Sequence, residues 1–240
     1  MLIGPQNSTL NVNHVRSRIR QAAAAAGRDP AAITLVAVTK AQTAETARLA
    51  ATAGVTDFGE NYLQEALPKM DRLADLGARW HFIGGVQSNK TRVIAERFDW
   101  VHSIDRLSIA RRLSEQRPYH AAPLNLCIQV ELVPEPRKGG VEPGEVAALA
   151  AASAQLPRVC LRGLMCVPPP QRGAAEERAV FARLRNLLQE LNANGHRLDT
   201  LSMGMSGDFE SAIAEGATIV RVGTALFGSR ETAGAGSGQQ

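Results

Sequence analysis

Apolar positions recur along the chain in two spacings, one typical of strands and one typical of helices. The strand-like runs occupy segments 33–38, 56–59, 80–84, 100–104, 124–132, 159–165, 200–204 and 218–223. Each run is followed by a helical pattern or by a loop that leads into one. Strands that alternate with helices predict a parallel sheet, and eight such units favour a closed (β/α)8 barrel of the TIM type.

The helical patterns predict one extra helix before the first strand. Its apolar stripe consists of Val12, Val15, Ile19 and Ala22, and Gly27 marks its end. The clearest helix covers 175–194, with Gly195 following as its C-terminal cap. An open, doubly wound sheet is the alternative fold, but no G-x-G-x-x-G follows the first strand, which weakens a dinucleotide-binding interpretation.

Length and composition predict one large domain. The chain has 240 residues, of which 45% are hydrophobic, and a single α/β barrel typically takes about 250. We assign the barrel to residues 1–230 and expect the Gly-, Ala-, Ser- and Gln-rich segment 231–240 to be a disordered tail. The N-terminus lacks the pattern of a signal peptide, and no apolar run is long enough for a membrane span.

Charge does not indicate a nucleic-acid partner. The net charge is +4, and most basic residues have acidic neighbours. The densest basic group lies along one predicted helix, where we interpret it as a solvated face: Arg106, Arg111, Arg112 and Arg117. No aromatic platform or known binding motif accompanies it.

The cysteines indicate a reducing compartment. Cys127, Cys160 and Cys166 are odd in number and lack the spacing of metal ligands. We therefore interpret them as reduced core thiols and expect a cytoplasmic protein with no metal site.

Two loops near the end of the chain have the composition of a phosphate-binding site. Segments 201–207 and 220–224 each run from a short apolar strand into small and hydroxyl residues. In a barrel these loops follow the last two strands, where barrel enzymes often bind phosphate through backbone N–H groups. We expect Ser206 to cap the following helix, and Gly223 and Thr224 to lie in the neighbouring loop.

Lys40 ends the first predicted strand, at the same face of the barrel as the two loops. Partial desolvation at a strand end favours the neutral amine, which can attack a carbonyl. A phosphate site near such an amine suggests a phosphorylated aldehyde held as a Schiff base. The alternative is a surface lysine paired with a carboxylate.

Other polar positions also have two interpretations. Alternation in the last strand points Arg221 into the barrel, where it would form a buried salt bridge, for instance with Glu131, or bind a cofactor ring nitrogen. His81 is either a satisfied core histidine or a general base. Lys90 and Lys138 lie in Gly- or Pro-rich loops and are most simply solvated, with a second phosphorylated ligand as the alternative.

The ordered motifs of the chain resemble the pyridoxal phosphate homeostasis protein family, a single-domain relative of the alanine racemase barrel. The matching segments are 37–40, 58–65, 80–84, 87–91, 101–105, 138–141, 161–165 and 201–230. Together they cover nearly the whole chain except the tail. Departures from the family pattern are Thr39 in place of a usual serine, 85–86 in place of Pro-Leu, and a different loop at 134–137.

The resemblance implies the cofactor pyridoxal 5′-phosphate (PLP) and a set of binding residues. Lys40 would hold PLP as a Schiff base, and Arg221 would face the pyridine nitrogen. The phosphate would be held by Ser206, Gly223 and Thr224, and the ring pocket would include Asn61 and Met203, with His81 as a weaker candidate.

Three functions agree with these features. The first is a PLP carrier that buffers the cofactor and delivers it to apo-enzymes, acting as a monomer without nucleic-acid or membrane partners. The second is a PLP-dependent amino-acid racemase of low activity, since Tyr62 and Tyr119 are the only tyrosines and no second domain is evident. The third is an aldolase-type barrel that uses Lys40 without a cofactor.

Overall fold

The computed structural model describes residues 5–133, 139–170 and 173–228, and for residues 5–10 the backbone alone. Eight parallel strands pair in sequence order, and β1 pairs with β8 to close a barrel. The predicted (β/α)8 fold is therefore confirmed. The strands are β1 Thr34–Val38, β2 Asp57–Glu60, β3 Arg79–Phe82, β4 Trp100–Ile104, β5 Leu124–Gln129, β6 Val159–Met165, β7 Thr200–Ser202 and β8 Ile219–Val222.

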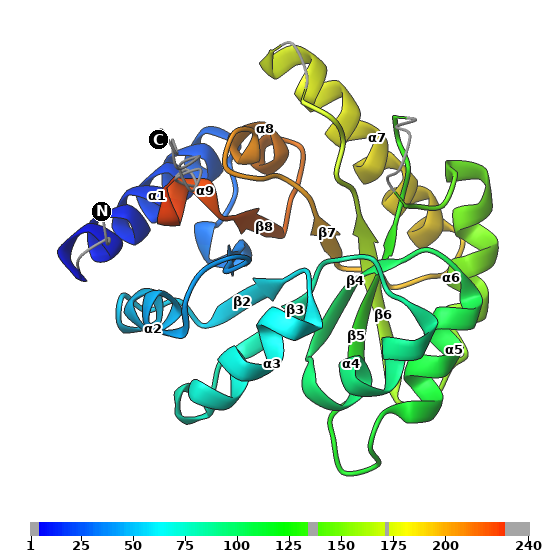
Figure 1. The fold of residues 1–240 in the computed structure, drawn as a ribbon. Helices are drawn as coiled ribbons and strands as arrows, with labels where there is room; N and C mark the ends of the chain where they lie inside the picture. Colours follow the sequence, from blue (N-terminus) through cyan, green and yellow to red (C-terminus); the bar gives the residue numbers. More distant parts are fainter. Residues whose placement is uncertain (1–4, 134–138, 171–172, 229–240) are drawn as a thin grey trace, which may run out of the picture.

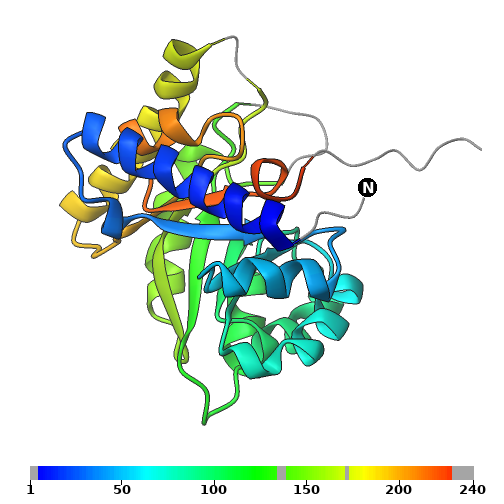
Figure 2. The ribbon, with the colours of Figure 1, turned by 90° about the vertical axis from the view of Figure 1, so that its left-hand side faces the viewer.

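Helices surround the strands (Figure 1). They are α1 Pro5–Ala25, α2 Ala44–Thr52, α3 Leu63–Arg72, α4 Thr91–Arg97, α5 Leu107–Gln116, α6 Val146–Ala154, α7 Ala174–Ala193, α8 Phe209–Ala214 and α9 Thr224–Phe227. The extra helix α1 packs against α2, α8 and α9, so the N-terminal helix lies beside the last helices of the chain (Figure 2). Val12, Val15 and Ile19 are buried in this contact as predicted, but Ala23 is more deeply buried than Ala22.

Several strands are shorter than predicted because glycines and loops follow them directly. The run 80–84 ends as a strand at Phe82, and the run 200–204 ends at Ser202. A Cβ on Gly204 would lie 2.6 Å from Ala212 Cβ, and the φ of Gly204 is +91°. This glycine therefore lets the chain leave β7 and pass closely over α8.

Two predictions about buried and exposed residues are wrong. Cys160 is exposed, whereas Cys127 and Cys166 are buried, and burial raises the pKa of each buried thiol to about 12. Arg117 is buried rather than solvated, because its guanidinium donates hydrogen bonds to the Ala95, Phe98 and Ala122 carbonyls.

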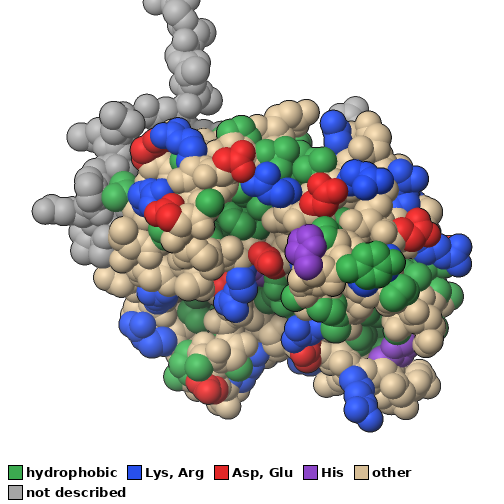
Figure 3. Space-filling model, turned by 90° about the horizontal axis from the view of Figure 1, so that it is seen from below, with side chains coloured by type: hydrophobic (Ala, Val, Ile, Leu, Met, Phe, Trp, Pro, Cys, Tyr) green, Lys and Arg blue, Asp and Glu red, His purple; other side chains and the backbone are tan. Residues whose placement is uncertain are grey.

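The surface carries both signs of charge. In the view from below, basic and acidic side chains are interspersed without a continuous basic patch on that face (Figure 3). None of the helices within the described ranges has the length and apolar character that a bilayer crossing requires. The proposed tail 231–240 lies outside the described residues.

Candidate functional site

A cavity of about 440 Å³ opens at the carboxyl ends of the strands. It lies where barrel active sites are found. The residues that line it come from six strand ends and from α9: Val38, Lys40, Gln42, Asn61, Ile83, Val167, Met205, Ser206, Gly207, Arg221, Gly223, Thr224, Phe227 and Gly228. The structure thus brings together Lys40, Asn61, Ser206, Arg221, Gly223 and Thr224, which the sequence places far apart.

Lys40 is half-buried in a tight turn at the end of β1. The Gln42 N–H donates to the Thr39 carbonyl at 2.9 Å, and Ala41 has a left-handed φ of +61°. A left-handed alanine costs about 1–2 kcal/mol, so other contacts must hold the turn. One of them is the Ala41 N–H, which donates to Glu65 Oε2 at 2.7 Å.

A buried ion pair between β2 and α3 also holds the turn at Lys40 in place. Lys69 Nζ of α3 lies 2.5 Å from Glu60 Oε1 and donates to the Thr39 carbonyl at 2.6 Å. Thr39 Oγ1 also donates to Glu60 Oε1, at 2.6 Å. All three side chains are buried, which explains why a hydroxyl residue precedes Lys40. The matching segment 58–65 includes Glu60, but no sequence signal indicates Lys69 as its partner, since Lys69 is one of several polar residues on the next helix.

Asn61 follows this pair at the end of β2 and reaches the cavity. Its Oδ1 atom is buried and has no hydrogen-bond partner among the described residues. A Cβ on Gly84 would lie 2.2 Å from the Asn61 carbonyl oxygen, so only glycine allows this close approach. The unpaired Oδ1 atom is a polar position that a ligand or water would satisfy.

Ser206 joins the two loops with phosphate-binding composition. Its Oγ accepts hydrogen bonds from the Gly223 N–H at 3.3 Å and the Ala225 N–H at 3.1 Å, at the start of α9. The predicted cap of α8 is wrong: α8 begins at Phe209 with Asp208 as its N-cap, and Asp208 Oδ1 accepts from the Met205 N–H. The serine hydroxyl therefore accepts from two backbone N–H groups at the start of α9 and does not cap α8.

Arg221 points into the barrel as alternation predicted, and its side chain is almost fully buried. It donates from Nη1 to Ser202 Oγ at 2.6 Å and from Nη2 to the Cys166 carbonyl at 2.9 Å. The suggested salt bridge with Glu131 is not formed. Burial lowers the pKa of Arg221, yet a guanidinium keeps its proton in proteins and can only donate.

Two predicted site residues lie away from the cavity. Met203 is fully buried and does not line it, whereas Met205 does. His81 is buried in the barrel interior, between Asp57 and His102, as a core histidine with both ring nitrogens hydrogen-bonded. Lys90 lies in an adjoining hollow of about 230 Å³ that shares Asn61 with the cavity, and Lys138 lies outside the described residues.

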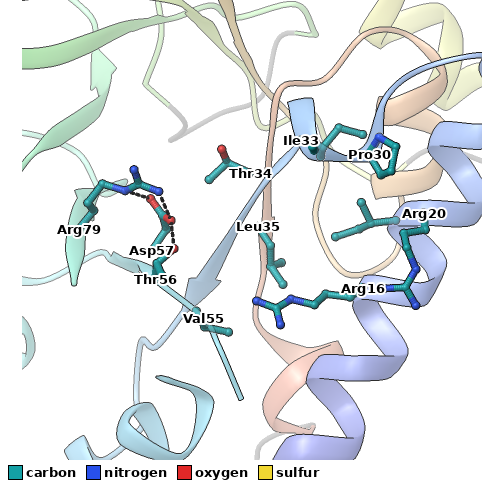
Figure 4. Close-up of a pocket in the computed structure, with 12 residues that line it drawn as sticks. Arg16, Arg20, Pro30, Ile33, Thr34, Leu35, Val55, Thr56, Asp57 and Arg79 are labelled. Carbon is teal, nitrogen blue, oxygen red and sulfur yellow. Dashed lines mark hydrogen bonds and ion pairs between the residues drawn. The ribbon is translucent and has the colours of Figure 1, made fainter. Parts of the chain in front are cut away.

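A further hollow of about 400 Å³ lies at the opposite end of the barrel, at the amino ends of β1, β2 and β3. Arg16 and Arg20 reach it from α1, and Asp57 and Arg79 face it as an ion pair (Figure 4). Within the described part of the chain, no group of three His, Cys, Asp or Glu side chains could hold a metal ion.

Comparison with known proteins shows what the chain is similar to. The model of the alanine racemase N-terminal domain family matches residues 10–231. The pyridoxal phosphate homeostasis protein of Pseudomonas aeruginosa is 59% identical over 92% of this chain and 95% of its own length. This chain belongs to the pyridoxal phosphate homeostasis protein family. The resemblance seen in the sequence motifs is thereby confirmed.

Solved structures agree with this family. PipY of Synechococcus elongatus PCC7942, a structure with PLP bound, is 41% identical with a TM-score of 0.78, covering 88% of this chain and 100% of that one. Alanine racemase of Corynebacterium glutamicum is 19% identical with a TM-score of 0.67, covering 92% of this chain and 62% of that one. The likeness to the racemase shows a shared barrel fold.

Lys69→Met tests the support behind the lysine turn. It leaves the Glu60 carboxylate buried without its cation, so we expect the free energy of unfolding to fall by about 3–5 kcal/mol. Denaturant titration measures this loss, and Lys90→Met, outside the ion pair, is expected to stay within about 0.5 kcal/mol. Adding Glu60→Gln to Lys69→Met should recover part of the loss. Equal stability of wild type and Lys69→Met would contradict this role.

Acid should destabilise the barrel through its buried histidines. Burial lowers the pKa of His81, and lowers the pKa of His102 well below its usual value, so both rings fold in the neutral form. In the unfolded chain they bind protons below about pH 6.5, so their contribution to stability is full above that pH and is lost as the pH falls. The free energy of unfolding should be lower at pH 5 than at pH 6.5, by at most about 2 kcal/mol for each histidine, and a flat profile would refute the neutral pair.

Proposed function

We propose that the chain binds PLP reversibly in the cavity at the carboxyl ends of the strands, with Lys40 as the covalent attachment point, and takes part in intracellular PLP homeostasis. The observation that carries this proposal is the meeting of three groups in one cavity: the Lys40 amine, the donor-only Arg221, and the Ser206 loop with the start of α9. The PLP-bound relative PipY has the same fold over its whole length.

The residues of the cavity fit such a ligand. Ser206 Oγ accepts from the Gly223 and Ala225 N–H groups, so its own hydrogen is left to donate into the cavity. With the Thr224 hydroxyl, which lines the same cavity, it provides donors suited to a phosphate. A Cβ on Gly207 would meet nothing within 4 Å, so the neighbouring loop leaves open space beside Ser206. The unpaired Asn61 Oδ1 offers an acceptor to a ring hydroxyl.

Each residue then has a distinct task. PLP supplies an aldehyde that condenses with amines and a pyridine ring that withdraws electrons from an attached amino acid. The half-buried Lys40 supplies the amine, and the turn at Ala41 aims it. Arg221 would donate a hydrogen bond to the pyridine nitrogen of bound PLP, and because a guanidinium keeps its proton it would not protonate that nitrogen.

A carrier fits this cavity better than a racemase does. Racemisation needs proton-transferring groups on both faces of the reacting carbon. The described residues that line the cavity include Lys40 but no Tyr, His, Cys, Asp or Glu. We therefore propose weak or absent racemase turnover, with α-hydrogen exchange of alanine abolished by Lys40→Ala as the result that would favour the enzyme.

The proposal includes delivery of PLP from a single-domain monomer, residues 1–230, to apo-enzymes. The cavity is open at the strand ends, and Lys40 is half-buried rather than enclosed. The free, buried Cys127 and Cys166 suit a reducing compartment, so we place this role in the cytoplasm. Delivery requires that an apo-enzyme gains PLP faster from this protein than from free solution.

The absorption spectrum tests the binding site. Adding PLP to the purified protein should produce a yellow band that sodium borohydride removes, and Lys40→Ala should lack this band. Lys90→Ala is the matched control and should keep it, because Lys90 lies in the adjoining hollow. A wild-type spectrum that does not respond to PLP would exclude both the carrier and the racemase.

A further inference from the structure

A chain of hydrogen bonds crosses the interior of the barrel from Arg221 to Asp57. Arg221 Nη1 lies 2.6 Å from Ser202 Oγ, which lies 2.7 Å from His102 Nδ1. His102 Nε2 lies 2.9 Å from His81 Nδ1, and His81 Nε2 lies 3.0 Å from Asp57 Oδ1. All five side chains are at most 4% exposed, so water does not compete for these bonds.

The two ends of the chain, together with a neutral His81, fix the direction of every bond. A guanidinium only donates, so Ser202 Oγ accepts from Arg221. A carboxylate only accepts, so His81 carries a proton on Nε2, facing Asp57. When His81 is neutral, its Nδ1 accepts from His102 Nε2, and His102 Nδ1 in turn accepts from the Ser202 hydroxyl.

The chain joins the cavity to the hollow at the amino ends of the strands. Asp57 is held there by Arg79, through Nε and Nη2, and by the Thr56 hydroxyl (Figure 4). Burial opposes ionisation of Asp57, but the hydrogen bonds from His81, Arg79 and Thr56 outweigh it and hold its pKa well below the usual range. The acceptor that ends the chain is therefore a permanent carboxylate.

We propose that Ser202, His102, His81 and Asp57 are positioning residues. Their hydrogen bonds fix the orientation of the Arg221 guanidinium, so that it donates hydrogen bonds toward the cavity. Ser202 and the Cys166 carbonyl commit one proton from each terminal nitrogen of Arg221. Arg221 also lines the cavity, so its remaining N–H groups can serve an acceptor there. That this acceptor is the PLP pyridine nitrogen rests on the proposed function, whereas the order of protons in the chain does not.

A rival arrangement has His81 charged beside Asp57. His81 would then donate from both nitrogens, His102 Nε2 would accept, and His102 would carry its proton on Nδ1 toward Ser202. The two arrangements therefore differ in the tautomer of His102. This difference can be measured without any ligand.

Long-range ¹H–¹⁵N correlation spectra of the ligand-free full chain report the protonation state and tautomer of both histidine rings. The sequence has five histidines, so assignment by single His→Gln variants of His14, His120 and His196 is straightforward. We expect His81 and His102 as neutral Nε2–H tautomers at pH 7. A charged His81, or His102 protonated on Nδ1, would overturn the proposal.

The affinity for PLP measures how far the chain of hydrogen bonds positions Arg221. Ser202→Ala removes the hydroxyl that holds Nη1, and the dissociation constant for PLP should rise about tenfold, whereas Ser202→Thr should restore it to within about twofold. Ser153→Ala removes another buried hydroxyl, one that has no hydrogen-bond partner in the described part of the chain, and should leave the constant unchanged.

The outcomes separate the two proposals. Unchanged PLP affinity in Ser202→Ala would overturn the positioning role, even if wild type binds PLP as proposed. If wild type does not bind PLP, the proposed function fails, and the tautomer spectra alone decide whether the chain fixes Arg221. If Ser202→Ala does not fold, Ser202→Cys provides a weaker donor in its place and should give an intermediate affinity.

Discussion

Closure of the barrel between β1 and β8 is the constraint on which the candidate site depends. Val36 pairs with Arg221 and Ala37 with Val222, so the last strand lies directly beside the first. This pairing brings the Lys40 turn next to the loops that carry Ser206 and Gly223, although about 180 residues separate them along the chain. On the other side of β8, backbone hydrogen bonds from Thr218 to Leu201, from Met203 to Ile219 and from Arg221 to Gly204 join it to the β7 segment.

Closure of the barrel also buries charged side chains, and hydrogen-bond partners in the interior stabilise them. Arg221 enters the barrel without a direct hydrogen bond to a carboxylate, and it donates instead to the neutral Ser202 hydroxyl and Cys166 carbonyl. The nearby Asp208 carboxylate opposes the cost of burying its charge. Asp57, paired with Arg79, lies at the other end of a chain of neutral groups. Outside the barrel wall, Glu60 and Lys69 form a direct buried pair. Both arrangements give a buried charge hydrogen-bond partners, although Glu60 Oε2 has none among the described residues, and both lie behind residues that face the cavity.

Much of this could be predicted from the sequence because strand periodicity is a local property. Alternation correctly pointed Arg221 inward, and the end of the first strand correctly placed Lys40 in the cavity. Partners across the barrel depend on register and curvature, which a single sequence does not give. For this reason the salt bridge of Arg221 with Glu131 was wrong, and the chain through His81 and His102 was not foreseen. The cap at Ser206 is wrong because α8 begins only at Phe209, and Ser206 Oγ instead accepts from the loop after β8.

Reduction of the PLP complex with borohydride, followed by peptide mapping, tests the central claim most directly. The lysines of the chain are Lys40, Lys69, Lys90 and Lys138, so each falls on a separate peptide after cleavage at arginine or glutamate. The account predicts that at one equivalent of PLP the reduced adduct lies on Lys40. An adduct located mainly on Lys90, on Lys138 or on the amino terminus would contradict it.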